Sequence, residues 1–490
     1  MPQSQHPVRL TQSLFPHRYS TVVFLSEHDD DQDVPSFHIS DKPVYFKQTT
    51  NVRLIKNIFL LSGCTSTKKS NLFSVKYGKV PSPESFKKLH KFQKVNHFPG
   101  TFQLGNKACL SRNMASLSRR HGRRNFEFVP KTFLLPEEAS ALKKFVDSNR
   151  SQKWIKKPKS GSNGVNIRMV PNINELNFSK LNCIMQQYIQ SYLIDGFKFD
   201  CRLYVLVTSV DPLKVYVFNN GLARFATMRY SKNSNNKFMH LTNFSIQKNR
   251  KGFIPNHSVE SDGQGSKWSL QALMSRLESM GVDVGLVWSR ITDLILKTII
   301  SAEGEINTRL KMLSQLPEPC FELFGFDVLL DRELKPWLIE VNTSPSMNQA
   351  SPIDRHIKST LWSSILTCLR VSPFDSAMIA MEREEQKKHR LLCSTKRTGR
   401  FNRTNFNMHQ GNSWLERLNP NELEVICNYE DEKRLARGFS SLFPTLNSRY
   451  YSFFSFTRHN NTLLRKWMEL KKDISSAVAL ERLRNIASCI

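Results

Sequence analysis

The stretch LFGFDVLLDRELKPWLIEVNTSPSM, from Leu323 to Met347, decides the fold. Two apolar runs flank the polar break DREL, and this pattern predicts a β-hairpin. Three polar side chains interrupt the apolar runs: Asp327, Glu340 and Asn342. An unpaired carboxylate inside a core costs several kcal/mol, comparable to what one well-packed apolar side chain contributes. These three residues therefore need a partner or a ligand.

Register brings the three polar residues together. Strand side chains alternate between faces, so Glu340 and Asn342 project from the same side. If the hairpin closes through the even-length loop Asp331–Leu334, Asp327 lies on that side too. Two carboxylates and an amide oxygen suit Mg²⁺, which recruits phosphate oxygens for its remaining positions. A hairpin with one solvated face is the alternative interpretation of the same pattern.

Composition limits the class of protein. The chain has 490 residues, a net charge of +29, 39% hydrophobic residues and 33 Phe, which predicts about two to four folded domains. No apolar run approaches the ~20 residues that a membrane helix needs. The start, MPQSQHPVRLTQSLF, lacks the apolar segment of a signal peptide. The charge predicts an acidic partner: nucleic acid, an anionic membrane or an acidic protein surface.

The nine cysteines are scattered and form no C-x-x-C pair. An odd, dispersed set favours reduced thiols in the cytosol over a disulfide framework or a zinc site.

Two segments are strongly basic. Gly105–Arg124 contains no acid and predicts a basic face, made of Lys107, Arg112, Arg119, Arg120, Arg123 and Arg124. Lys387–Arg403 holds seven Lys or Arg and no acid. We interpret this second segment as a candidate helix for contact with the acidic partner, with a solvated linker as the equal alternative.

Strand and helix patterns mix along the middle of the chain. Residues 197–230 read as a three-strand meander with turns at Asp211–Pro212 and Asn219–Gly221. Residues 267–316 carry helical periodicity. Few helices per strand predict an α+β fold rather than a doubly wound one.

Four regions are expected from these shifts in composition. They are an N-terminal domain (1–132), a central subdomain (133–210), a subdomain carrying the magnesium site (211–372) and a basic helical extension (373–490).

Several polar groups are candidates for chemistry. Gly161 and Gly164 lie in a flexible loop after Lys157, which suits phosphate, although a tight β-turn is the commoner explanation. Three further residues, Lys198, Asp200 and Arg202, alternate along one strand face, and Arg224 lies on the expected third strand. The alternative for these four is a solvent-facing salt-bridge ladder. His240, in the motif HLTNF, is interpreted alone as a core histidine.

An ordered set of motifs resembles the tubulin tyrosine ligase-like family, and most closely its glutamylase branch. The motifs are NHFPGTFQLGNKACLSRN, KWIKKP, KFDCRLYVLVTS, GLARFA, KFMHLTNFSIQK, CFELFGFDVLLDRELKPWLIEVNTSPSM and RLNPNEL. The resemblance covers residues 9–375 well and the remainder more loosely. It implies an ATP-grasp fold, in which ATP lies between two sheets.

The resemblance also implies the site residues. ATP is expected to contact Lys157, Ser160, Gly161, Ser162, Asn163, Gly164, Val165, Asn166, Gln186, Tyr188, Ile189, Lys198 and Asp200. The incoming amino acid is expected at Arg202, Arg224, Thr242 and Asn243, and two Mg²⁺ ions at Asp327, Glu340 and Asn342. Lys198, Arg202 and Glu340 are the expected catalytic residues, and Lys107 is expected to face the site.

The implied activity is an ATP-dependent ligase that adds free L-glutamate to γ-carboxylates in acidic tubulin tails through an acyl phosphate. A monomer is expected, in the cytoplasm and on the cytoskeleton, including the cilium, basal body or centriole. The resemblance makes Lys387–Arg403 a candidate microtubule-contacting helix. Neither a membrane nor nucleic acid is expected as a partner, since no recognition-helix, zinc or RNP motif accompanies the charge.

Three positions depart from the family pattern. Asn163 replaces an Arg and Asn166 a Gly in the phosphate loop, and Phe244 replaces a Tyr after HLTN. A cation and a hydroxyl are lost, although Asn tolerates left-handed backbone angles. The alternatives are therefore a glycylase or tyrosine ligase on the same fold, a non-catalytic microtubule-binding pseudoenzyme, and a nucleic-acid binder. All three metal ligands, both arginines and Lys157 are present, which favours activity.

Overall fold

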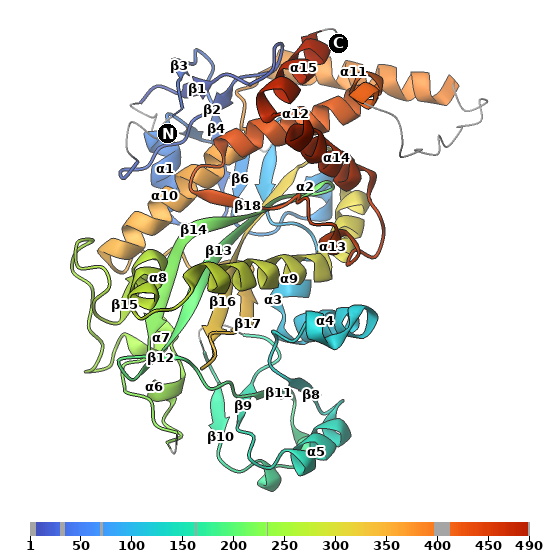
Figure 1. Cartoon of the computed structure of the whole chain (residues 1–490). Helices are drawn as coiled ribbons and strands as arrows, with labels where there is room; N and C mark the ends of the chain where they lie inside the picture. Colours follow the sequence, from blue (N-terminus) through green and yellow to red (C-terminus); the bar gives the residue numbers. More distant parts are fainter. Residues whose placement is uncertain are drawn as a thin grey trace.

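The computed structural model describes residues 6–29, 35–68, 72–161, 164–232, 234–395 and 412–488. A large mixed sheet forms the centre, with helices on both faces, and a smaller sheet lies below it in Figure 1. This arrangement confirms the α+β class expected from the sequence. Within these residues, no helix combines the length and the apolar character needed to cross a membrane.

The large sheet is built around a long antiparallel hairpin. Strands β13 (Phe197–Val210) and β14 (Leu213–Phe225) turn at Asp211–Pro212 as expected. The second turn, expected at Asn219–Gly221, is wrong, because β14 continues through it. A register shift between the pairs Leu203–Gly221 and Val205–Val217 absorbs the turn-like residues as an irregularity of the strand. Arg224 thus lies on the second strand of a hairpin, not on a third strand.

The hairpin of β16 (Cys320–Leu330) and β17 (Pro336–Asn342) differs from its expected closure. Leu330 pairs with Pro336, so the loop holds residues 331–335 and is odd in length. A register shift beside Asp327 then adds one residue to β17, so that Asp327 pairs with Glu340. The odd loop length and the one-residue register shift compensate each other. The expected loop is wrong, but the three polar residues share a face as predicted, since Gly325 pairs with Asn342.

Eleven strands of the described chain form the large sheet. Its main path runs β15 (Lys267–Ser269), β14, β13, β16, β7 (Lys94–Asn96), β6 (Val75–Tyr77), β4 (Tyr45–Gln48), β5 (Thr65–Ser66). Strands β12 (Leu193–Ile194), β17 and β18 (Phe439–Phe443) pair with β13, β16 and β14. Because β16 pairs with β7 in parallel, the N-terminal strands continue the sheet that carries the candidate site. A separate three-stranded sheet has the order β2 (Thr21–Val22), β1 (Arg9–Thr11), β3 (His38–Ile39).

The two faces of β13 have different neighbours. Its odd-numbered residues, such as Phe199 and Val205, join one core with helices α8 (Leu270–Ser279) and α9 (Val284–Leu313). Its even-numbered Tyr204 and Leu206 join another core with α1 (Arg53–Leu61) and α10 (Pro352–Cys368). Because side chains alternate along a strand, Lys198, Asp200 and Arg202 lie on the same face of β13 as Tyr204 and Leu206, nearer the small sheet.

The small sheet has the order β10 (Arg168–Val170), β9 (Trp154–Lys157), β11 (Cys183–Gln187), β8 (Thr132–Leu135). Helix α5 (Ala139–Ser148) packs on it through Leu142 and Val146, against Phe133, Trp154 and Met185. Shorter helices complete the described chain: α2 (Pro83–Lys87), α3 (Phe102–Gly105), α4 (Lys107–His121), α6 (Lys237–His240), α7 (Phe244–Gln247) and α13 (Ser448–Tyr451).

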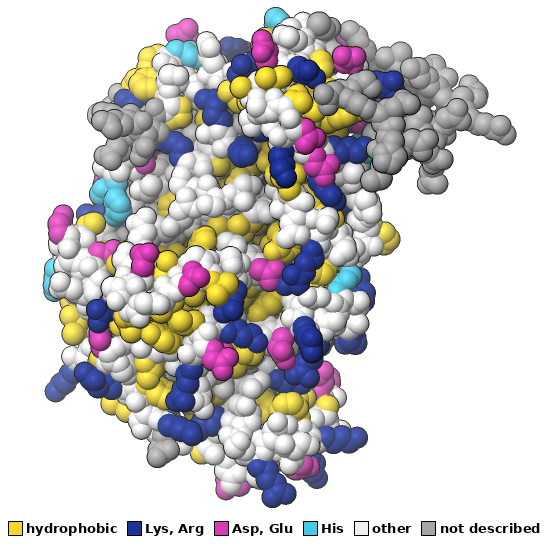
Figure 2. All heavy atoms as spheres, viewed as in Figure 1, with side chains coloured by type: hydrophobic (Ala, Val, Ile, Leu, Met, Phe, Trp, Pro, Cys, Tyr) yellow, Lys and Arg dark blue, Asp and Glu magenta, His cyan; other side chains and the backbone are white. Residues whose placement is uncertain are grey.

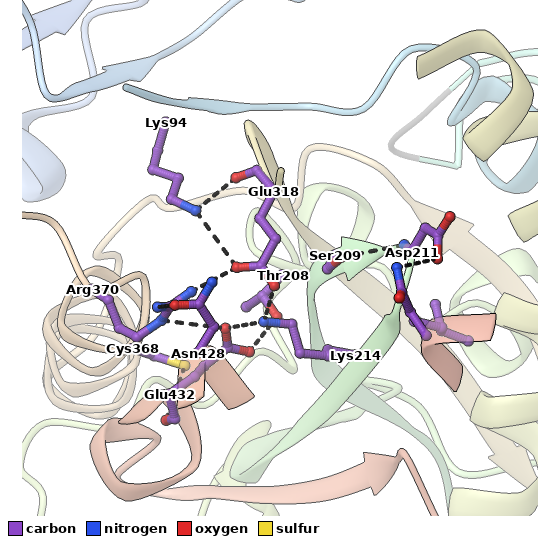
Figure 3. A network of polar contacts seen from close by, with 12 residues as sticks. Lys94, Thr208, Ser209, Asp211, Lys214, Glu318, Cys368, Arg370, Asn428 and Glu432 are labelled. Carbon is purple, nitrogen blue, oxygen red and sulfur yellow. Dashed lines mark hydrogen bonds and ion pairs between the residues drawn. The ribbon is translucent and has the colours of Figure 1, made fainter. Parts of the chain in front are cut away.

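Helices dominate the C-terminal region: α11 (Ser376–Thr395), α12 (Pro420–Leu435), α14 (His459–Asp473) and α15 (Ser476–Ser488). Ser475, whose φ is 72°, separates the last two helices, α14 and α15. A buried ionic network, drawn in Figure 3, joins α12 to the large sheet. Lys214 Nζ of β14 lies 2.5 Å from Glu432 Oε2 of α12 and 2.7 Å from Glu318 Oε1. Arg370 donates to Glu318 Oε2 at 2.6 Å.

Candidate active site

A cleft lies between the small sheet and the large sheet. The small sheet and its following segment contribute Ile155, Lys157, Gln186, Gln187, Tyr188 and Ile189. The large sheet contributes Lys198, Asp200, Asp327, Leu329, Ile339 and Glu340, and the segment at α6 and α7 contributes His240, Leu241, Thr242 and Asn243. Ten of the twenty residues predicted for ATP, the amino acid and the metal ions therefore line one cleft.

The predicted phosphate loop follows β9 directly. Ser162 and Asn163 lie outside the described residues, while Ser160, Gly161, Val165 and Asn166 are exposed. Gly161, Gly164 and Asn166 have φ of 129°, 71° and 61°, so Asn166 adopts the left-handed angle expected of it. A Cβ on Gly164 would lie 2.5 Å from Ile246 Cδ1, which explains the glycine where the loop packs against α7.

Lys157 forms part of the cleft wall. Its Nζ donates to Gln186 Oε1 at 2.6 Å, and Gln186 Nε2 donates to Thr132 Oγ1 at 3.0 Å. Burial lowers the pKa of Lys157 to about 8, although the Glu340 carboxylate opposes the shift. The Lys157 ammonium is therefore poorly solvated, and a bound anion would stabilise its charge.

Lys198 is the second buried lysine of the cleft. Its Nζ donates to Tyr188 Oη at 3.1 Å, and Tyr188 Oη lies 2.8 Å from His240 Nδ1. Burial lowers the pKa of Lys198 to about 7, with Asp200 opposing the shift. His240 is buried as expected, but it also lines the cleft and holds Tyr188. A buried lysine with so low a pKa gains most from an anionic ligand.

Arg202 and Arg224 converge on two carboxylates. Arg202 Nε donates to Asp327 Oδ1 at 2.5 Å, and Arg224 donates to Asp327 Oδ2 at 2.8 Å and to Asp200 Oδ1 at 2.9 Å. Burial would raise the pKa of Asp327, but the two guanidinium groups hold it well below its usual range. The alternative interpretation, a solvent-facing salt-bridge ladder, is wrong because these ion pairs are buried.

Glu340 and Asn342 lie beside Asp327. Lys107 Nζ is 3.1 Å from Glu340 Oε2, so Lys107 faces the site as expected. The Asn342 amide nitrogen donates to Gly325 O at 3.3 Å and to Glu340 Oε1 at 3.4 Å, which leaves its oxygen as the ligand atom. No cluster of three His, Cys, Asp or Glu suited to a metal occurs in the described part of the chain. The predicted set is two carboxylates and one amide, whose oxygens are the donors that Mg²⁺ prefers.

The segment after β14 closes the cleft beside the phosphate loop. Thr242 is buried, and Asn243 precedes α7 with its Oδ1 3.1 Å from the position of a Cβ on Gly164. Arg202, Arg224 and Asn342 are not part of the cleft lining but contact residues that are. The apolar walls Ile155, Leu241 and Leu329 were not predicted, since an apolar residue in a strand carries no signal that separates a cleft from a core.

A charged cleft between a small and a large sheet is the architecture of a protein that binds a compact, highly charged ligand. The chain belongs to the tubulin-tyrosine ligase family, whose family model matches residues 86–379. Membership confirms the ATP-grasp fold class expected from the motifs.

Curated relatives extend the similarity over most of the chain. Tubulin monoglutamylase TTLL4 of Homo sapiens is 35% identical over 488 residues, covering 94% of this chain and 40% of the relative. Tubulin polyglutamylase TTLL5 of Mus musculus is 35% identical over 451 residues, covering 87% and 33%. A probable beta-tubulin polyglutamylase of Tetrahymena thermophila is 36% identical over 324 residues, covering 64% and 27%. The chain thus spans at most about 40% of the length of these relatives.

Proposed function

We propose that this protein is an ATP-dependent ligase that adds glutamate to γ-carboxylates of glutamate residues in acidic tubulin tails. The observation that carries the proposal is the convergence of Asp327, Glu340 and Asn342 with Lys157 and Lys198 at one cleft. The names of the three relatives support tubulin as the substrate and glutamate as the added residue.

ATP is proposed to lie between the two sheets. Tyr188, Ile189 and Gln186 line the cleft and suit the adenine base. Lys157, Lys198, Asp200 and the loop from Ser160 to Asn166 would contact the ribose and phosphates. Asp327, Glu340 and Asn342 would hold two Mg²⁺ ions, which supply charge neutralisation of the phosphates when bound.

The reaction follows from these positions. An oxygen of the tail carboxylate attacks the γ-phosphorus of ATP, ADP leaves, and an acyl phosphate forms. The α-amine of free glutamate then attacks the acyl carbon, phosphate leaves, and the nitrogen loses a proton. Lys198 would neutralise the transferring phosphoryl group, and Arg202 would stabilise the oxyanion of the second step.

The incoming amino acid is proposed to bind at Arg202, Arg224, Thr242 and Asn243. Arg224 is buried and held between Asp200 and Asp327 through Nε and Nη2, so its Nη1 is left in a fixed position to donate to a carboxylate.

The acidic partner would reach the site along a basic surface. Arg112, Arg119, Arg120, Arg123 and Arg124 are exposed on or directly after α4, whose first residue, Lys107, contacts Glu340. Figure 2 shows Lys and Arg side chains over much of one face of the molecule. We propose a monomer acting in the cytoplasm and on the cytoskeleton, including cilia, basal bodies or centrioles. Of the basic segment Lys387–Arg403, residues 396–403 lie outside the described residues.

The proposal is tested by incubating the chain with tubulin, ATP, Mg²⁺ and labelled glutamate, followed by mass spectrometry of the tubulin tails. We expect Glu340→Gln to lower glutamate incorporation about a hundredfold or more, because it removes a metal ligand's charge. Binding to microtubules should remain unchanged, since Glu340 lies inside the cleft.

Other outcomes would replace the proposal. Incorporation of glycine or tyrosine in place of glutamate would identify a different ligase on the same fold. Microtubule binding with no incorporation by the unmodified chain would identify a pseudoenzyme.

A further inference from the structure

A lysine that the motifs did not single out lies next to Arg224. Lys267 of β15 pairs in register with Arg224 of β14, so both side chains leave the sheet on the same face. The neighbouring Trp268 belongs to the core on the opposite face. Lys267 is buried, and its Nζ lies 4.0 Å from the ring centroid of Phe244, two residues after Thr242.

Helix α10 supplies a second lysine at the same place. Lys267 Nζ donates to Asp354 Oδ2 at 2.6 Å, and Lys358 Nζ lies 2.9 Å from Asp354 Oδ1. Lys358 Nζ also donates to the backbone oxygen of Asn348 at 2.5 Å. All three side chains are at least 90% buried. Burial would raise the pKa of Asp354, but the two ammonium groups hold it below its ordinary value.

Two buried lysines share one carboxylate, so this triad carries an excess positive charge. The imbalance continues through the site. Its cations are Lys107, Lys157, Lys198, Arg202, Arg224, Lys267 and Lys358, and its carboxylates are Asp200, Asp327, Glu340 and Asp354. Uncompensated buried charge is costly, and an anionic ligand compensates it. The phosphates of ATP would act near Lys157 and Lys198, whereas Lys267 and Lys358 lie on the Arg224 side.

We propose that Lys267 and Lys358 form a second carboxylate-binding subsite, which binds the side-chain carboxylate of the incoming glutamate while Arg202 and Arg224 bind its α-carboxylate. The inference rests on the proposed glutamate ligase activity. Asp354 acts as a positioning residue, because it holds both ammonium groups and reaches neither arginine. A neutral amino acid such as glutamine leaves the excess charge unpaired, so the subsite gives specificity for an acidic side chain.

The test measures KM for glutamate and for ATP in Lys267→Met and Lys358→Met, with glutamine as the competing amino acid. We expect KM for glutamate to rise about tenfold or more and the preference for glutamate over glutamine to fall by a similar factor. KM for ATP should change less than about twofold. Lys267→Arg, which keeps the charge, should recover part of the glutamate preference.

Lys297→Met is the matched control. Lys297 is as buried as Lys267 and pairs with one carboxylate, Asp293, at 2.5 Å, but it lies on α9. Its loss should lower stability without changing the preference for glutamate. Thermal unfolding of each variant separates misfolding from loss of specificity.

Calorimetric titration of free L-glutamate and L-glutamine into the full chain, with a non-hydrolysable ATP analogue, separates the two proposals. Glutamate binding that weakens in Lys267→Met supports the subsite even if the unmodified chain fails to modify tubulin, which would refute only the proposed function. The subsite would be overturned if both methionine variants kept the preference for glutamate, or if KM for ATP rose as much as KM for glutamate. Absence of glutamate binding by the unmodified chain would also overturn it.

Discussion

Lys198 combines burial, a tyrosine partner and a low pKa within one side chain. Its Nζ contacts the Tyr188 hydroxyl and lies 4.4 Å from the centroid of the Tyr188 ring. Strand periodicity predicted the face on which Lys198 lies, and the motif resemblance predicted its role. Its contact with Tyr188, ten residues earlier in the chain, depends on how the segment after the small sheet packs against β13.

Lys198→Met should change the pH dependence of stability. The folded-state pKa is about 7, below the unfolded value, so the unfolded chain binds more protons between pH 7 and about 10.5. Stability therefore rises with pH in this window. Without nucleotide, we expect the free energy of unfolding to rise between pH 7 and pH 9 by about 2 kcal/mol more in the unmodified chain than in Lys198→Met. Chemical denaturation at both pH values measures the difference, and equal slopes would contradict it.

Irregularities in individual strands determine which way the side chains of the site point. The register shift in β17 restores the pairing of Asp327 with Glu340, and the one in β14 keeps Arg224 opposite Asp200. The β14 irregularity brings Gly221 against Arg202, where an added Cβ would lie 2.5 Å from the Arg202 backbone oxygen. The sequence NNGLA suggested a turn because Asn and Gly favour turns, but the strands on both sides continue the same pairing.

Gly221→Ala should therefore lower the free energy of unfolding by about 1–3 kcal/mol and displace Arg202. Gly304→Ala is the matched control, since Gly304 lies within α9 and its added Cβ meets nothing within 4 Å. That control should raise stability by about 0.5–1 kcal/mol, because alanine favours a helix over glycine. Urea unfolding of both variants checks the opposite signs, and a neutral Gly221→Ala would show that the strand relaxes.

In the whole molecule, the ionic network of Figure 3 joins α12 to the large sheet. Lys214 is completely buried between Glu318 and Glu432, and Thr208 Oγ1 donates to Glu432 Oε1 at 2.5 Å. Lys214 lies on the same face of β14 as Tyr216, which packs in the core with α10. Side chains alternate along the strand, so Lys214 points toward α12 and Arg224, farther along the strand, points toward the site.

Lys214→Met should lower the free energy of unfolding by about 3–5 kcal/mol, because two buried carboxylates lose their shared cation. Arg465→Met, which removes the more exposed pair with Glu469, should change stability by less than about 0.5 kcal/mol. Denaturant unfolding followed by circular dichroism compares the two. Similar losses would mean that the buried network contributes little.

Binding to microtubules should weaken steeply with salt if the exposed arginines of α4 and the residues after it form the contact. We expect affinity to fall about tenfold between low salt and about 0.15 M, because exposed charges are screened over a Debye length. Cosedimentation at several salt concentrations measures the slope, and a variant with Arg119, Arg120, Arg123 and Arg124 changed to Gln should flatten it. An equal slope in that variant would assign the contact to another surface.

The sequence by itself determined which side chains of one strand share a face, because covalent geometry makes the strand period two. Glu340 with Asn342, and Lys198 with Asp200 and Arg202, follow from that alone, as does the left-handed angle tolerated at Asn166. The tertiary structure decided which strands and helices become neighbours. Lys267 lies beside Arg224 because β15 pairs with β14, and Lys358 joins Lys267 at Asp354 because α10 packs there. Such neighbours come from burial of apolar surface between segments far apart in the chain, for which local spacing carries no signal.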